Sequence, residues 1–176
     1  MNVEQKLSGE DGGTELLKPV SVEDMDQVIE LAKRAYPEKI RGNVIASLLK
    51  QQEYMRAGLD NGTRQFKVEV DGKIAGVCGW YKRGDTCPDD VIWGDWFFVD
   101  PAKRNTTLAY RIGIELLEKA KLSGYKRMYV ETTDDQPDYF NIASYLLRSG
   151  FNQKGTLSNY FEKGVDLNIF SLNLTI

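Results

Sequence analysis

A short polar turn between an apolar run and an amphipathic segment constrains this chain most. The turn covers residues 99–109 and reads VDPAKRNTTLA, after the apolar run Val91–Phe98. The pattern predicts a strand, a tight turn and a helix over Arg104–Leu122. The first turn of a helix leaves backbone N–H groups unpaired and carries partial positive charge. With small hydroxyl residues and Arg104 beside it, this helix start is suited to a pyrophosphate, and a simply capped helix is the alternative.

The rest of the pattern predicts one mixed α/β domain. Residues 1–13 form a polar leader, and no repeat or linker divides residues 14–176. Apolar alternation and short apolar runs indicate strands, and 3.6-residue periodicity indicates helices. The expected order is a strand at Leu16–Pro19, a helix capped by Ser21 that ends before Pro37, a helix at Gly42–Ala57, strands at Gln65–Val70, Ile74–Tyr81 and Val91–Val99, the helix Arg104–Leu122, a strand at Lys126–Thr132, a helix at Asp138–Ser149, and strands at Gly155–Glu162 and Asp166–Leu174.

Composition narrows the chemistry. The chain contains no histidine, which excludes Ser-His-Asp and Cys-His catalysis and histidine-ligated metals. Its two cysteines, Cys78 and Cys87, lack zinc-site spacing, and Cys78 lies in an apolar strand as a core thiol does. The net charge of −3, with no basic stripe, argues against nucleic acid, and no apolar run reaches the roughly 20 residues that span a bilayer. We therefore expect a cytoplasmic monomer or homodimer that binds no metal, nucleic acid or membrane.

At the turn the chain resembles the GNAT superfamily of N-acetyltransferases, whose acetyl-CoA signature reads Q/R-x-x-G-x-G/A. Arg104 and Ala109 fit this pattern, whereas Thr107 stands where the family usually has glycine. The resemblance covers about Leu16–Leu174 in the order of elements. It implies a central mixed, mostly antiparallel sheet with helices on both faces and a splay between strands four and five.

The resemblance also implies how acetyl-CoA binds as a cosubstrate. The pantetheine arm would pair with the end of the fourth strand, and the pyrophosphate would lie on the following loop. Asn141 resembles an asparagine that contacts CoA at the start of a later helix, although its spacing is altered. The cofactor-binding residues expected on this basis are Phe97, Phe98, Val99, Arg104, Asn105, Thr106, Thr107, Leu108, Ala109, Tyr110 and Asn141.

Three side chains are candidates for acid–base catalysis. Glu131 ends an apolar strand and corresponds to a general-base glutamate of some GNAT members, the alternative being a solvated residue at the rim of the sheet. Asp95, on the preceding strand, is the rival base or else a buried partner for an N–H group. Tyr145 lies one residue before Leu146, where the family has the tyrosine that protonates the CoA thiolate. A shift of one residue turns a side chain by about 100° around a helix, so core packing is the alternative for Tyr145.

The residues and the resemblance together predict an acetyl-CoA-dependent N-acetyltransferase that acts on a primary amine by direct transfer. The acceptor ammonium must lose a proton before it attacks, so a base or a water chain is needed. The acidic loops Asp85–Asp90 and Thr132–Asp138 indicate a cationic acceptor, although such loops are equally often only solvated. Thr107 and the shifted tyrosine leave a second interpretation open, a non-catalytic acyl-CoA-binding or regulatory module of the same fold.

Overall fold

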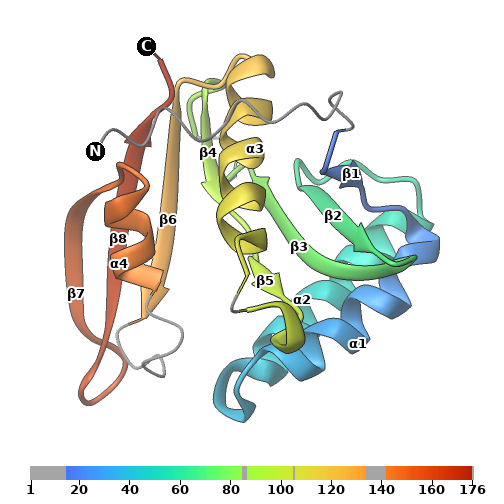
Figure 1. The fold of residues 1–176 in the computed structure, drawn as a ribbon. Helices are drawn as coiled ribbons and strands as arrows, with labels where there is room; N and C mark the ends of the chain where they lie inside the picture. The colour runs from blue at the N-terminus through green and yellow to red at the C-terminus, as the bar shows by residue number, and fades with distance from the viewer. Residues whose placement is uncertain (1–14, 85–86, 105, 134–141, 176) are drawn as a thin grey trace.

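A mixed, mostly antiparallel sheet of eight strands forms the centre of the molecule (Figure 1). The computed structural model describes residues 15–84, 87–104, 106–133 and 142–175. Seven strands follow one another in the order β1-β2-β3-β4-β6-β8-β7, and β5 pairs separately with β3. Among the described strands, β4 and β6 form the parallel pair. The strands are β1 Lys18–Pro19, β2 Arg64–Val70, β3 Lys73–Tyr81, β4 Val91–Gly94, β5 Phe98–Val99, β6 Arg127–Thr133, β7 Asn152–Glu162 and β8 Val165–Asn173.

Helices cover both faces of the sheet, as the resemblance implied (Figure 1). Helices α1 (Met25–Ala35) and α2 (Glu38–Arg56) lie on one face. Helices α3 (Leu108–Leu122) and α4 (Ile142–Arg148) lie on the other. None of the described helices is long and apolar enough to cross a bilayer.

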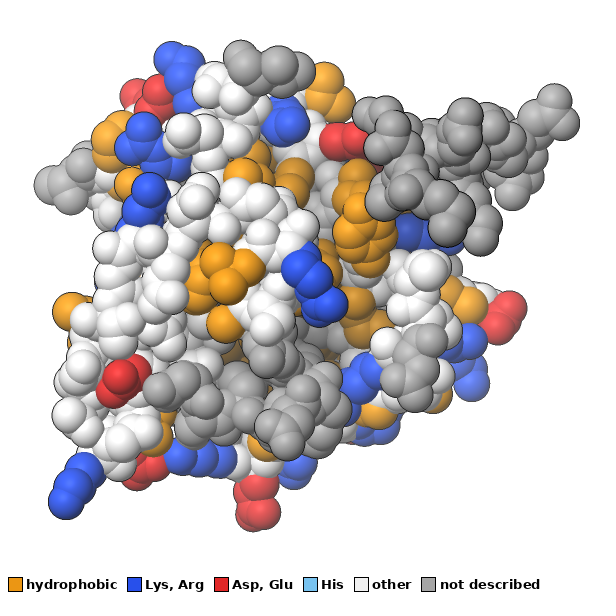
Figure 2. Space-filling model, turned by 60° about the vertical axis from the view of Figure 1, so that its left-hand side comes forward, with side chains coloured by type: hydrophobic (Ala, Val, Ile, Leu, Met, Phe, Trp, Pro, Cys, Tyr) orange, Lys and Arg blue, Asp and Glu red, His pale blue; other side chains and the backbone are white. Residues whose placement is uncertain are grey.

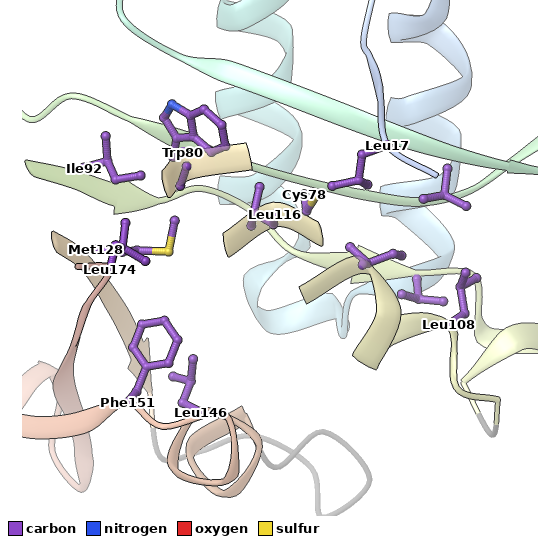
Figure 3. Close-up of a cluster of buried hydrophobic side chains, with 14 of the residues drawn as sticks. Leu17, Cys78, Trp80, Ile92, Leu108, Leu116, Met128, Leu146, Phe151 and Leu174 are labelled. Atoms are coloured by element: carbon purple, nitrogen blue, oxygen red, sulfur yellow. The ribbon is translucent and has the colours of Figure 1, made fainter. Parts of the chain in front are cut away.

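Each face of the sheet has its own hydrophobic core. On the α1–α2 face, helix residues such as Met25 and Leu48 pack against Val77 and Phe98 of the sheet. On the α3–α4 face, a second cluster joins both helices to the sheet (Figure 3). Cys78 is fully buried in this second cluster, which confirms the prediction of a core thiol. Figure 3 labels its members Leu17, Cys78, Trp80, Ile92, Leu108, Leu116, Met128, Leu146, Phe151 and Leu174.

Local sequence chemistry explains the elements that were predicted correctly. Asp71 and Gly72 both have positive φ, at 52° and 72°, as a two-residue turn between β2 and β3 requires. Ser21 and Asp24 form a capping box before α1, in which the Ser21 N–H donates to Asp24 Oδ2 at 2.8 Å. These short-range signals need no tertiary contact, so the sequence alone reveals them.

The start of α3 was predicted too early. The helix begins at Leu108 rather than Arg104, and a separate 3₁₀ turn, η3, covers Pro101–Lys103. Asp100 Oδ1 accepts from the Ala102 N–H at 2.9 Å, and this capping bond holds the chain in a tight turn before the helix. Helix α2 was predicted too late. It begins at Glu38, directly after Pro37, instead of at Gly42.

The expected fourth strand, Val91–Val99, is in fact two strands separated by a bulge. Between the pairs Trp80↔Gly94 and Val77↔Phe98, β3 advances by three residues and the facing chain by four. An inserted residue of this kind bends a strand and interrupts its pairing. The Asp95 N–H donates to the Gly79 carbonyl at 3.0 Å, which keeps the bulge attached to β3.

The bulge separates the two halves of the sheet. Strand β4 pairs with β6 only as far as Trp93↔Tyr129, and beyond this point β6 continues with β8 alone. Strand β5 pairs only with β3 among the described strands. Within the described residues, the outer edge of β5 and the facing edge of β6 after Tyr129 therefore bear backbone groups with no strand partner. This is the splay that the resemblance implied.

Candidate active site

The start of α3 leaves backbone N–H groups without a helical acceptor. The Arg111 N–H donates to the Thr107 carbonyl at 3.0 Å and closes the first turn. The N–H groups of Ala109 and Tyr110 precede this bond, and a helix has no acceptor of its own for such groups. Partial positive charge collects at the same place. These features suit a phosphate group, and phosphate binding at this helix start stays a prediction.

The two threonines before α3 use their hydroxyls differently. Thr106 Oγ1 donates to the Lys103 carbonyl at 2.7 Å and accepts from the Leu108 N–H at 3.2 Å. Thr107, in the position of the family's glycine, is exposed and its side chain makes no capping bond. Leu108 is buried, so only its backbone lies near the turn surface. Thr106 thus shapes the turn, whereas the Thr107 hydroxyl makes no capping bond.

Arg104 contacts the end of α1. Its Nη2 donates to the carbonyl of Ala35, the last residue of that helix. From the other side, Arg34 Nη2 lies 3.1 Å from Asp100 Oδ2. Two arginines therefore tie the turn between β5 and α3 to α1. Arg104 positions this turn in addition to bringing a positive charge to it.

The outer edge of β5 provides unpaired backbone groups next to this turn. The Asp100 N–H donates to the Ala75 carbonyl of β3 at 2.8 Å. Because backbone groups of successive residues in a strand point to opposite edges, those of Val99 and Phe97 point away from β3. Tyr36 Oη donates to the Phe97 carbonyl at 3.0 Å, and this bond holds the bulge. The Val99 groups remain available to an extended ligand, whereas the Phe98 side chain is buried in the core.

Glu131 lies in β6 two residues beyond the last β4–β6 pair, in the part of the strand that borders the splay. Its Oε1 accepts from Arg83 Nη1 at 2.6 Å. The Arg83 guanidinium lies 4.5 Å from the ring centroid of Trp93, and the Trp93 ring stacks on Tyr129. This carboxylate is therefore part of a fixed ion pair rather than a freely solvated rim residue.

Asp95 is partly buried at the bulge. Its Oδ2 accepts from Gln65 Nε2 at 2.7 Å. Burial raises the pKa of Asp95 above its ordinary value, while the hydrogen bonds from Gln65 and the Trp96 N–H act in the opposite direction. A side-chain amide and a backbone N–H are thus its partners, and the backbone N–H is of the kind that the sequence analysis considered.

Tyr145 lies between the bulge and α3. Its ring centroid is 6.1 Å from that of Phe97, and its hydroxyl donates to the Ala109 carbonyl at 3.3 Å. An added Cβ on Gly113 would lie 1.9 Å from this hydroxyl. Burial raises the pKa of Tyr145 above its ordinary value. Leu146, the next residue, is buried in the core. The tyrosine therefore combines a packed position with a place beside the splay.

Some sequence expectations remain open at this site. Asn105, Asn141 and Asp85 lie outside the described residues. Of the acids expected to attract a cation, Asp89 pairs with Lys82 and Asp90 pairs with Lys126. Figure 2 shows the Lys and Arg side chains of the described residues dispersed over the face in view, with Asp and Glu among them. The charge of this face is therefore mixed.

Two residues at the site, Arg83 and Gly113, were not predicted from the sequence. Arg83 follows β3 and gives no sequence signal, since its partner Glu131 is 48 positions away. Gly113 does carry a signal, because a glycine inside a helix is unfavourable by about 1 kcal/mol relative to alanine and calls for a packing reason.

Two shallow depressions, of about 370 and 270 Å³, lie at the other end of β6 around Arg127. They contain neither Glu131 nor the turn before α3. We place the candidate site at the splay instead, because open backbone edges and the unpaired helix start meet there.

Replacing Asp95 by Asn tests its environment. Because the pKa of Asp95 is raised, the folded protein binds more protons than the unfolded chain between the two pKa values, and the free energy of unfolding falls as pH rises through this range. Asn keeps an acceptor for Gln65 and removes the buried charge. We expect urea unfolding to show D95N gaining stability relative to wild type from about pH 4 to neutral pH. A constant difference between the two proteins would contradict the raised pKa.

Replacing Gly113 by Ala tests the packing of Tyr145. We expect G113A to lower the melting temperature, because the new Cβ displaces the Tyr145 hydroxyl and the lost packing outweighs a helix gain of about 1 kcal/mol. Gly42 in α2 has no atom within 4 Å of an added Cβ, so G42A is the matched control and should raise stability. In a Y145F background the hydroxyl is gone, and G113A should then become neutral or stabilising. Additive effects in this cycle would mean that the two residues do not clash.

Comparison with known proteins finds the same fold in several solved structures. An acetyltransferase of the GNAT family from Desulfovibrio desulfuricans superposes with a TM-score of 0.75 at 16% identity, covering 90% of this chain and 98% of that one. The ribosomal-protein-S18-alanine N-acetyltransferase of Escherichia coli gives 0.68 at 16% identity, covering 91% and 94%. An aminoglycoside 6′-acetyltransferase of type Ii gives 0.72 at 15% identity, covering 91% and 97%.

These structural similarities show the fold, and a comparison with curated protein sequences gives no match. The sequence model of the acetyltransferase (GNAT) family matches residues 25–151. This match contains both helices of one face, the bulge, the turn before α3 and the β6 strand with Glu131. The chain belongs to the acetyltransferase (GNAT) family of enzymes.

Proposed function

We propose that this protein is an acetyl-CoA-dependent N-acetyltransferase that moves an acetyl group directly to a primary amine. The observation that carries the proposal is the unpaired edge of β5, which leads into the open start of α3 and borders the part of β6 that bears Glu131. A backbone edge binds an extended amide chain, and the helix start binds phosphate. The two features follow each other in the order that a CoA molecule requires.

Different residues are the proposed ligands of different parts of acetyl-CoA. The N–H groups of Ala109 and Tyr110, with the Thr107 hydroxyl, are the proposed pyrophosphate ligands. The backbone of Val99 is the proposed partner of the pantetheine amides. Acetyl-CoA supplies the acetyl group as a thioester, and a backbone N–H of the bulge or of β5 would stabilise the charge that develops on the carbonyl oxygen.

Two side chains are the proposed proton acceptor and proton donor of the reaction. Glu131 would accept the proton of the acceptor ammonium, because an amine attacks only in its neutral form. Tyr145 keeps its proton at neutral pH, and its hydroxyl is the proposed donor to the leaving sulfur. Asp95 is the alternative base, although its carboxylate already accepts a hydrogen bond from Gln65.

An amine acceptor is consistent with the named structural neighbours. The Escherichia coli neighbour is named for alanine of a ribosomal protein, and another neighbour for an aminoglycoside. Both names specify amine-bearing compounds. We extend only this shared class to the present chain, which includes small molecules as well as peptide and protein amines.

A non-catalytic CoA-binding module is the second candidate. The observation that favours it is the Tyr145 hydroxyl, which contacts the Ala109 carbonyl and fills the space above Gly113. A thiol-release assay with acetyl-CoA and an amine panel distinguishes the two. Turnover supports the enzyme, whereas saturable CoA binding without turnover supports the module.

Replacing Arg104 by Ala tests the cofactor turn. Acetyl-CoA should raise the melting temperature of the wild type by binding the folded state. We expect R104A to weaken acetyl-CoA about tenfold or more, since a charge-assisted hydrogen bond contributes about 1.5–3 kcal/mol. The matched control is R34A, which breaks the other tie between this turn and α1. Equal losses in both variants would mean that Arg104 acts by holding the turn, and unchanged affinity in R104A would remove it from the site.

Replacing Glu131 by Gln tests the proposed base. Gln keeps the shape and removes the basicity, so we expect folding and CoA affinity to persist while turnover falls by about 100- to 10,000-fold. Raising the pH toward the pKa of the acceptor amine should partly restore the rate, because the amine then arrives deprotonated. Equal rates for E131Q and wild type at neutral pH would transfer the role to Asp95 or a water chain.

A further inference from the structure

Arg83 is held in place at the entrance to the candidate site. Its Nη1 donates to Glu131 Oε1 at 2.6 Å, and its guanidinium lies 4.5 Å from the Trp93 ring centroid. Trp93 in turn stacks on Tyr129, with ring centroids 4.9 Å apart. A carboxylate on one side and an aromatic face on the other restrict the orientation of the guanidinium.

Arg83 is the exposed member of the ion pair. Its side chain is 52% exposed, against 29% for Glu131. A guanidinium has five N–H donors, and the bond to Glu131 uses one of them. Within the described part of the chain, no acceptor binds the remaining donors. Arg83 therefore presents oriented positive charge to whatever approaches Glu131.

This arrangement suits an acceptor that carries both charges. Glu131 keeps its second oxygen for an ammonium group, and Arg83 offers free donors for a carboxylate. In an α-amino acid these two groups are separated by a single carbon, so the zwitterion can lie antiparallel to the Arg83–Glu131 pair. A purely cationic amine would instead meet the exposed guanidinium and be repelled by it.

We propose that Arg83 binds the carboxylate of the acceptor and that the acceptor is an α-amino acid. The inference rests on the proposed function, in which Glu131 faces the acceptor amine. Arg83 then selects the substrate, while the proton transfer belongs to Glu131.

Matched acceptors test the inference. L-Phenylalanine and L-phenylalaninamide differ only at the carboxylate, and 2-phenylethylamine lacks it altogether. We expect the wild type to have a kcat/KM for phenylalanine about tenfold to hundredfold higher than for phenylalaninamide. This ratio is the effect of one charge-assisted hydrogen bond. In R83M this ratio should fall to about one, and R83K should lie between the two, because lysine keeps the charge without the planar fork. A loss of activity that comes from disturbing Glu131 lowers kcat/KM for both acceptors alike, so it does not change their ratio.

The neighbouring Lys82 provides the control variant. It pairs with Asp89 rather than Glu131, so K82M should leave the ratio unchanged. A second readout is calorimetric binding of phenylalanine in the presence of CoA, which R83M should weaken at least tenfold without affecting phenylalaninamide.

The outcomes separate the two levels of the proposal. A wild type that acetylates all three amines equally, or an R83M variant that keeps the preference, would overturn the role of Arg83 and leave the proposed function standing. If phenylalanine binds through Arg83 but neither these three amines nor the amine panel is acetylated, the enzyme is overturned and the binding site stands.

Discussion

One inserted residue in the chain opposite β3 determines the form of this molecule. The bulge at Asp95–Phe97 ends the pairing of β4 with β6 and sends β5 along β3 alone. Backbone groups at a sheet edge need partners, and a buried unpaired group would destabilise the fold by about 1–3 kcal/mol. Here the two edges at the splay have no strand partner among the described residues. The opening is stable because Tyr36 and Gln65 hold the bulge from the sides with hydrogen bonds.

The bulge explains why one part of the sequence analysis was wrong while its neighbours were right. The run Val91–Val99 is apolar almost throughout, and periodicity in such a run cannot reveal an extra residue, because that residue appears only in the register against β3. The turn at Asp71-Gly72 was predictable because its left-handed backbone is a property of two residues. The start of α3 is a different case, because local side-chain bonds of Asp100 and Thr106 stabilise a separate turn where the helical pattern had been extended back to Arg104.

The candidate site shows the same limit. Glu131 could be singled out because a carboxylate at the end of an apolar strand is unusual. Its partner Arg83 could not, because the pair forms only when β3 and β6 are brought together through β4. Tyr145 lies between these cases. From the sequence, Tyr145 lies one residue before the position of the family's proton donor. The structure adds that its hydroxyl fills the space left by Gly113 in α3, which the sequence could not show.

The turn before α3 connects the two sides of the proposed reaction. Arg104 and Asp100 bind the end of α1, and Tyr36, the next residue after that helix, holds the Phe97 carbonyl of the bulge. The phosphate end and the bulge end of the proposed cofactor site are therefore fixed to the same helix terminus. The α1 terminus is in turn joined to α2, whose Lys39 pairs with Glu162 at the end of the β7–β8 hairpin. These contacts connect the turn before α3 to the bulge on one side and, through α2, to the β7–β8 hairpin on the other.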